Sequence, residues 1–494
     1  MRETKQQNAY LTVFLSMILT IVLSLVLVLV DGARRNGVRQ ISEIVTDTGV
    51  SYVFSEYHRE LMRRYDLFFI DTSYGTAGGG ISRTTEHLKT CLETNLTPKG
   101  YGALTAGTLT GVGLSDARIT GYRTIFDENG KALREQIAAY FTSEVMTGQA
   151  WNIANLSGRL QARGWDSESP DVYENYSKDV RKKLSEADTM GVPRDGYDDL
   201  DGDGIEDEVD ISAGNPFEAL DRRLSQPVLV QIFGSESNLS AKSIQNPFSK
   251  RRVMGGTGAR AENTHAYTPA GSMMMVLYLN EKCGDYRTPG TGALSYEKEY
   301  VLCGKSTDRQ NLSAVCTRLL AVREAANLTY LLSSRKRMAQ AKAAGALLSL
   351  IVLSPQLEPL FTAAAVVIWS YIESLTDVRT LMKGNRVPIL KTDRTFQNGL
   401  ASILQVDTWQ GNTKGQDQGF TYEEYLNAFL YLQDLASPGT TNVRLLDLIE
   451  QNLRLTKGNG NFRIDNLVDV IEIACDFRGK GGITCSVYRS AGYD

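Results

Sequence analysis

The aspartates between Asp199 and Asp210 are the residues whose spacing most clearly indicates a chemistry. The chain reads DLDGDGIEDEVD there, with aspartates at loop positions 1, 3, 5, 9 and 12 and glycine at position 6. Carboxylates at alternate positions converge on a hard cation such as Ca²⁺, the glycine allows a sharp turn, and position 7 offers its backbone carbonyl. The pattern predicts a calcium site whose ligands are Asp199, Asp201, Asp203, Ile205, Asp207 and Asp210.

The predicted role of this calcium ion is structural. Repulsion among five aspartates opposes closure of the loop without a cation, so calcium would order the polar insertion at 165–235. The loop resembles the DxDGDGIxD loops of thrombospondin type 3 repeats and dockerins over these 12 residues. Asp210 replaces the usual bidentate glutamate, which predicts an affinity on the order of 10⁻⁴ to 10⁻³ M. A solvated acidic turn is the alternative.

Other kinds of site find little support in the sequence. The six cysteines form no Cys-x-x-Cys pair, and the histidines stand far apart at 58, 87 and 265, which argues against zinc. No short motif pairs a nucleophile with a base, so we expect a non-enzymatic protein without a small-molecule substrate. Because 53 basic residues face 57 acidic ones, no positive field exists to hold nucleic acid.

Two of the cysteines, Cys475 and Cys485, flank the sequence DFRGKGGIT, which contains a predicted hairpin turn. On paired strands they could form a cross-strand disulfide in an oxidising environment. The alternative is that both stay reduced and buried.

An uncharged run from Tyr10 to Val30 carries the strongest signal for location. Its 21 residues span about 31 Å as a helix, which matches the hydrocarbon thickness of a bilayer. A cleaved signal peptide has a shorter apolar core and ends in small residues, whereas DGARRNG follows here. We predict a cytoplasmic leader at 1–8 and a retained single-pass anchor at 9–31 in the cell membrane.

The charges that flank the anchor do not by themselves place the body outside. Arg2 and Lys5 precede the anchor and Arg34, Arg35 and Arg39 follow it, a count that favours the opposite topology. The leader is too short to form a domain, however, and the acidic calcium-type loop suits an extracytoplasmic setting. We therefore expect the C-terminal body to be extracytoplasmic.

The anchor is predicted to continue as an amphipathic stalk helix over 32–65. Apolar residues recur in this segment mostly at steps of three and four, as on one face of a helix. Phe54, Tyr57 and Leu61 are candidate assembly contacts on the stalk, although they can equally pack on the protein's own body.

The rest of the chain predicts an α+β, helix-rich body. A mixed α/β body at 66–335 carries the polar insertion, a hydrophobic helical segment follows at 336–393, and a C-terminal helical region at 394–494 ends in a β-hairpin. Helices are expected near 421–436 and 443–455.

The hydrophobic segment contains two apolar runs within 343–372, separated by Pro355 and Pro359. Neither run is long enough to cross a membrane, which takes about 20 residues. Buried helices of the body are therefore preferred over a membrane-lying hairpin.

Several blocks of the sequence carry a family resemblance. These blocks are AYLTVFLSMILTIVLSLVLVLVDGAR at 9–34, EYHRELMRRYDLFFIDTSYG at 56–75, LSYEKEYVLCGK at 294–305, VREAANLTYLLS at 322–333, TDVRTLMKGNRVPILK at 376–391 and DLIEQNLRLTKGNGNFRIDNLVDVIE at 447–472. As a set these blocks resemble an uncharacterised family of membrane-anchored clostridial proteins, related to TadE/TadG-like minor pseudopilins of tight-adherence (Tad) pili. The resemblance implies an envelope protein whose partners are other pilin-like or secretion-platform subunits.

One feature departs from the pilin pattern. Pilin-type precursors usually place a glutamate a few residues into the apolar run, whereas this run has Thr12 and Ser16 and no acid until Asp31. A retained anchor therefore fits better than processing by a prepilin peptidase. The expected function is a membrane-anchored, pseudopilin-like component of a Tad-type pilus or cell-surface assembly. The alternative is a calcium-stabilised surface adhesin or receptor, or an envelope hydrolase.

Overall fold

The computed structural model describes the chain in segments that form two compact units. These segments are 2–97, 110–142, 148–162, 197–198, 207–208, 225–245, 247, 255–257, 267–351, 355–399 and 418–493. The first unit combines 1–140, 250–266 and 452–494, and the second combines 141–249 and 267–451. Each unit is therefore built from separated parts of the sequence.

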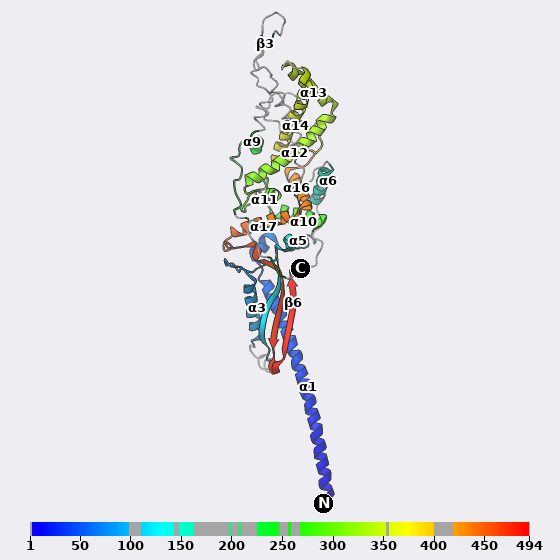
Figure 1. Ribbon diagram of the computed structural model, residues 1–494, viewed down its shortest axis with the longest axis vertical. Helices are drawn as coiled ribbons and strands as arrows, with labels where there is room; N and C mark the ends of the chain where they lie inside the picture. The colour runs from blue at the N-terminus through cyan, green and yellow to red at the C-terminus, as the bar shows by residue number, and fades with distance from the viewer. Residues whose placement is uncertain are drawn as a thin grey trace. The chain divides into compact units, whose positions relative to one another are not determined.

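The first unit combines a long N-terminal helix with an antiparallel sheet (Figure 1). The helix α1 spans Arg2–Ser55, and the sheet is centred on β5 (Leu467–Arg478). β5 pairs with β2 (Gly113–Thr124) along one edge and with both β1 (Ile70–Asp71) and β6 (Thr484–Gly492) along the other. The unit also contains α2 (Arg59–Tyr65), α3 (Ile81–Leu96), most of α5 (Asp127–Thr142) and the 3₁₀ turns Ile464–Asn466 and Lys480–Gly482.

The two halves of α1 have opposite surroundings within this unit. Every residue from 11 to 30 is exposed, whereas Val38, Val45 and Val53 on the second half are buried. The second half packs against α3 and the sheet in a shared apolar core. Gly49 allows this close approach, because a Cβ at that position would lie 2.7 Å from a side-chain carbon of Leu92. The first half therefore presents apolar surface, and the second half belongs to the fold.

The stalk contains two helices instead of the single helix predicted over 32–65. α1 ends at Ser55, and α2 begins at Arg59 after an extended residue, His58. The His58 backbone N–H donates to the Phe69 carbonyl at 2.9 Å, and its ring Nδ1 accepts from the Leu61 N–H at 3.1 Å. His58 thus caps a new helix, and its backbone bonds to the chain leading into β1.

The second unit is helical over most of the residues that the structure describes. Its elements are α6 (Gly148–Gln161), α9 (Val228–Phe233), α10 (Pro269–Lys282), α11 (Glu297–Cys303), α12 (Asp308–Ser333), α13 (Arg335–Ile351), a 3₁₀ turn (Pro355–Leu357), α14 (Glu358–Met382), α16 (Tyr422–Ala436), α17 (Pro438–Arg454, whose last residues belong to the first unit) and the short strands β3 (Tyr197–Asp198) and β4 (Asp207–Glu208).

The helix α14 forms the core of the second unit. It packs against α12 and α13, and its Trp369 is fully buried with its ring edge-on to Phe396. By length and composition, Leu11–Ser55 and Pro355–Met382 could each cross a membrane, but their most apolar windows are 0% and 72% buried. This burial agrees with the preference for buried helices in the part of the segment 343–372 that α14 covers.

The α+β, helix-rich class is confirmed by the many helices and the antiparallel sheet. The C-terminal hairpin is present as β5 and β6, and α16 and α17 lie close to the predicted helices. The predicted domain boundaries differ from the structure, because 452–494 joins the first unit instead of the helices that precede it in sequence.

Candidate functional site

The predicted calcium ligands lie outside the described residues, apart from the backbone of Asp207. The short strands β3 and β4 pair on either side of 199–206, with Asp198 opposite Asp207. Among the described residues, no cluster of three His, Cys, Asp or Glu side chains could hold a metal ion. The calcium site therefore stays a prediction.

We expect calcium to raise the melting temperature of the full-length protein in detergent. At a concentration about tenfold above the dissociation constant, binding to the folded state alone adds about 1.4 kcal/mol of stability. The double variant Asp201→Ala, Asp203→Ala should lose this gain, because two of the five carboxylates are removed. Thermal unfolding followed by circular dichroism, with calcium and with a chelator, measures both. An equal response to calcium in the double variant would rule out the site.

The three candidate assembly contacts on the stalk all pack within the first unit. Leu61 is fully buried. The Phe54 ring meets the Tyr493 ring edge to face with centroids 4.9 Å apart, and the Tyr57 and Phe68 rings are 5.4 Å apart. The alternative of packing on the protein's own body therefore describes these side chains, and Leu61 is not available to a partner.

The exposed face of the stalk carries other apolar residues. Ile44 is 65% exposed and Tyr52 is 44% exposed, eight positions apart on the same side of α1. Ile44 stands next to the buried Val45 on α1, so the two neighbouring apolar residues point to different surroundings.

Cys475 and Cys485 are free thiols. The register of β5 and β6 sets Cys475 opposite Val487 and Cys485 opposite Phe477, so the two cysteines are not directly opposed. Burial raises the pKa of Cys475 to about 11, which keeps the thiol protonated at neutral pH. The reduced alternative matches this arrangement.

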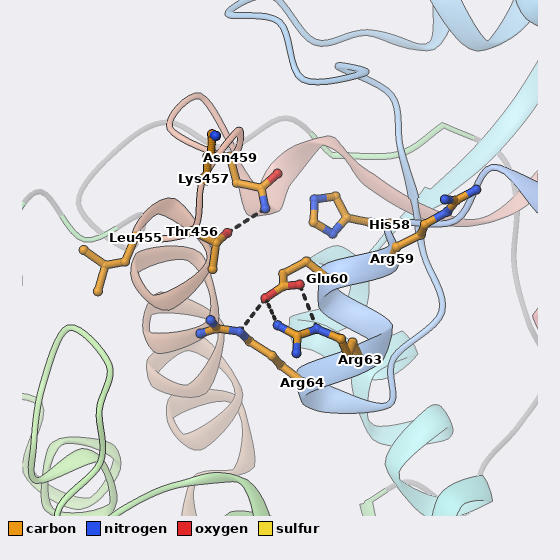
Figure 2. A pocket seen from close by; sticks show the side chains of 9 residues that line it. All are labelled: His58, Arg59, Glu60, Arg63, Arg64, Leu455, Thr456, Lys457 and Asn459. Carbon is orange, nitrogen blue, oxygen red and sulfur yellow. Dashed lines mark hydrogen bonds and ion pairs between the residues drawn. The ribbon is translucent and has the colours of Figure 1, made fainter.

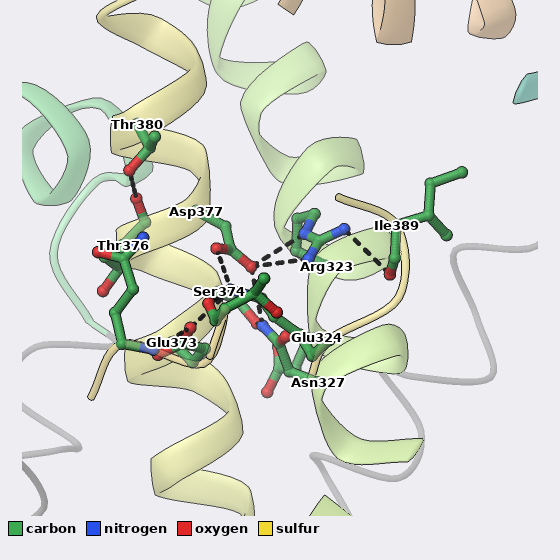
Figure 3. A network of polar contacts seen from close by, with 12 residues as sticks. Arg323, Glu324, Asn327, Glu373, Ser374, Thr376, Asp377, Thr380 and Ile389 are labelled. Atoms are coloured by element: carbon green, nitrogen blue, oxygen red, sulfur yellow. Dashed lines mark hydrogen bonds and ion pairs between the residues drawn. The ribbon is translucent and has the colours of Figure 1, made fainter. Parts of the chain in front are cut away.

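The most concentrated set of buried charges lies in the core of the second unit (Figure 3). Arg323 on α12 donates from Nε to Oδ2 of Asp377 on α14 at 3.0 Å, and its Nη2 lies 2.9 Å from the same oxygen. Lys391 follows α14 in the chain, and its Nζ lies 2.6 Å from the carboxylates of both Asp377 and Glu373. All four side chains are 0% exposed. Two positive and two negative charges thus balance in the core, and we call these residues the buried charge network.

Hydrogen bonds from neighbouring groups hold the carboxylates of this network in place. Glu373 accepts from the Asn398 backbone N–H at 2.9 Å and from the Asn398 side chain at 2.7 Å. Burial by itself would raise the pKa of Asp377, but the charges of Arg323 and Lys391 outweigh it and lower that pKa. The network joins α12, α14 and the segment after α14, and this arrangement suits a structural role.

Sequence reasoning missed the buried charge network, although its residues lie in or beside blocks that carry the family resemblance. Arg323 stands in the block at 322–333, and Asp377 and Lys391 stand in the block at 376–391. The available signal was the spacing of Glu373 and Asp377, four residues apart on the apolar helix α14. Two acids on one buried face require cations from elsewhere in the chain.

A second set of buried charges surrounds Lys298 in the same unit. Its Nζ lies 2.7 Å from the Asp285 carboxylate, and both side chains are almost fully buried. Beside it, Glu299 accepts from the Tyr422 hydroxyl at 2.6 Å. Burial raises the pKa of Glu299 to about 7, so this carboxyl titrates near neutral pH. Lys298 and Glu299 belong to the block at 294–305, whereas Asp285 and Tyr422 lie outside it.

These features define the class of protein: a helix-rich α+β protein with a long apolar helix near its N-terminus and closed charge clusters in its helical unit. The model of a family of unknown function (DUF5702) matches residues 206–479, more than half of the chain, and the chain belongs to this family. The match includes both buried charge clusters and β5, and it leaves out α1. No curated protein and no solved structure matches the chain.

Proposed function

We propose that this protein is a membrane-anchored, non-enzymatic, pseudopilin-like component of a Tad-type pilus or cell-surface assembly. In this proposal the apolar half of α1 lies in the cell membrane as a single crossing, and both units are extracytoplasmic. Its partners are other pilin-like or secretion-platform subunits.

The observation that carries the proposal is the division of α1 into two halves. Residues 11–30 expose an uncharged, mostly apolar surface about 30 Å long, and the same helix then enters the core of the first unit. Exposing this much apolar surface to water is energetically unfavourable, and contact with lipid or with other apolar helices removes that cost.

The continuity of α1 favours a retained anchor over a cleaved signal sequence. The helix runs without a break through 31–37, where a signal sequence would present a cleavage site after its apolar core. A helix that is embedded at one end and packed on an antiparallel sheet at the other is also the build of pilin-like proteins. The sequence blocks that resemble the TadE/TadG-related family support the same proposal.

Site-specific photo-cross-linking in cells that naturally produce the protein tests the assembly role. A photoreactive residue at Ile44 samples the exposed face of the stalk, and one at Val53, which is fully buried, is the matched control. We expect Ile44 to capture a pilin-like subunit or a membrane platform protein, identified by mass spectrometry, and Val53 to yield products within the chain only.

A result in which Ile44 and Val53 give the same intramolecular products would contradict the proposal. Capture of an extracellular ligand by Ile44, without any pilus or secretion subunit, would favour a surface adhesin or receptor instead.

A further inference from the structure

A solvent-open cavity of about 610 Å³ lies in the first unit between α2 and the turn that follows α17 (Figure 2). One wall consists of His58, Arg59, Glu60, Arg63 and Arg64, and the other consists of Leu455, Thr456, Lys457 and Asn459. We call it the basic cavity, because its lining has four cationic side chains and one carboxylate.

The cations of the basic cavity fall into two pairs. Arg63 and Arg64 both bind Glu60, with the closest N···O distances 2.6 and 2.7 Å. This pairing lowers the pKa of Glu60 to about 2, chiefly through its hydrogen bond with Arg63. The side chains of Arg59 and Lys457 are exposed and make no ion pair or hydrogen bond with any residue that the structure describes. The cavity therefore has an excess of positive charge at neutral pH.

Most hydrogen-bond acceptors that line the cavity are already engaged within the protein, whereas several donors are not. Thr456 accepts from the Asn459 amide at 2.7 Å and donates to the Leu453 carbonyl, so its hydroxyl is engaged. His58 accepts at Nδ1 from the Leu61 N–H, and its ring faces Asn459 across the cavity (Figure 2). Both Glu60 oxygens accept from arginines. The groups left for a ligand are thus mainly N–H donors of cationic side chains.

A ligand that complements this lining is rich in acceptors and poor in donors. Phosphodiesters satisfy this condition, because each phosphate offers charged oxygens and no N–H group. A polypeptide satisfies it less well, since its backbone N–H groups need acceptors. The cavity volume lies in the range of about 300–1,000 Å³ that is typical of sites for organic ligands, so it exceeds the needs of a single small ion.

Two sources of phosphate are disfavoured by position and lining. If α1 is embedded as proposed above, about 37 Å of helix separate Val30 from Ser55, so lipid headgroups of that bilayer do not reach the cavity. Single-stranded nucleic acids bind by stacking their bases on aromatic side chains, and no Phe, Tyr or Trp lines the cavity.

We propose that the basic cavity binds a phosphodiester-linked polymer of small polar units, with Arg59 and Lys457 contacting successive phosphates. This inference concerns a ligand of the first unit and goes beyond the proposed assembly role. It remains testable if that role proves wrong, because binding is measured on the isolated full-length protein.

The test uses fluorescein-labelled synthetic poly(glycerol phosphate) and the full-length protein in detergent, with fluorescence anisotropy at several salt concentrations. The variant Arg59→Gln, Lys457→Gln should weaken binding at least tenfold. It should also flatten the dependence of log K on log salt by about 0.7–0.9 per lost phosphate contact, as with nucleic-acid polyanions. The glutamines leave the Glu60 pairs intact, and thermal unfolding checks that the variant is folded.

Two control variants make this result specific. Arg335→Gln, Arg394→Gln removes two exposed cations of the second unit and should leave binding unchanged. Arg59→Lys, Lys457→Arg keeps the charge and should retain most of the affinity. If the double glutamine variant does not fold, Lys457→Gln alone should still produce a smaller loss in the same direction.

Competition with unlabelled anions decides the class of ligand. If inorganic phosphate displaces the labelled polymer as effectively as unlabelled polymer does, when both are compared by total phosphate, the cavity is a small-anion site. That result would overturn the proposal. Polyglutamate that competes as well as poly(glycerol phosphate) would indicate an acidic polypeptide, and a single-stranded oligonucleotide that does so would indicate nucleic acid. If Arg335→Gln, Arg394→Gln lost as much affinity as Arg59→Gln, Lys457→Gln, the binding would be non-specific electrostatic attraction, and the proposal would be wrong.

Discussion

Replacing Lys391 by methionine is expected to lower the free energy of unfolding of the second unit by about 3–5 kcal/mol. The substitution keeps an unbranched side chain but removes the cation that lies 2.6 Å from both Glu373 and Asp377. Arg323 then faces two buried carboxylates alone, and the core carries an uncompensated negative charge. Urea unfolding of the full-length protein, followed by circular dichroism, measures the loss.

Two further variants separate the charge effect from loss of packing. Lys336→Met removes an exposed lysine and should change stability by no more than about 0.5 kcal/mol. Asp377→Asn added to Lys391→Met restores neutrality, and the asparagine oxygen can still accept from Arg323 and Asn327 as Oδ2 does now. This double variant should recover part of the lost stability. If it were less stable than Lys391→Met alone, charge balance would not be what the network provides.

Replacing Leu19 and Val22 by arginine is expected to release the protein from the membrane fraction. Both side chains are exposed near the middle of the apolar half of α1. An arginine at the centre of a spanning helix raises the free energy of insertion by about 2.5–3.5 kcal/mol, and the two act on the same crossing. Fractionation of cells followed by extraction of membranes with alkaline carbonate measures the change.

A matched variant places the same two charges outside the predicted crossing. Ile44→Arg, Tyr52→Arg changes exposed positions of the stalk, and this protein should stay in the carbonate-resistant pellet. The anchor would be wrong if Leu19→Arg, Val22→Arg fractionated like the unchanged protein. Recovery of the unchanged protein from the medium, cleaved just after Val30, would identify a signal sequence instead.

Elements whose signals are local could be predicted from the sequence. The apolar run of α1 and the helices α16 and α17 follow from hydrophobic content and periodicity within 15 to 25 residues. The hairpin β5–β6 follows from alternation on both sides of a glycine-rich turn. In each case the residues that decide the structure are close together in the sequence.

Features that depend on distant partners could not be predicted in this way. Nothing near Leu467 indicates that β5 pairs with β2 and β1 from the other end of the chain. The break at His58 lacks a glycine or proline and arises because its backbone bonds to Phe69. The basic cavity combines α2 with a turn near 457, so no single stretch of sequence contains its pattern.

The central position of β5 also sets the order in which the protein can mature during synthesis. The ribosome delivers α1, α3 and β2 first, but the strand that joins them arrives only after the entire second unit has emerged. Until then the valines of α1 that face the sheet have no strand to cover them. A translation product that stops before Leu467 therefore exposes this stripe and becomes a substrate for chaperones and proteases, however well its helical unit has folded.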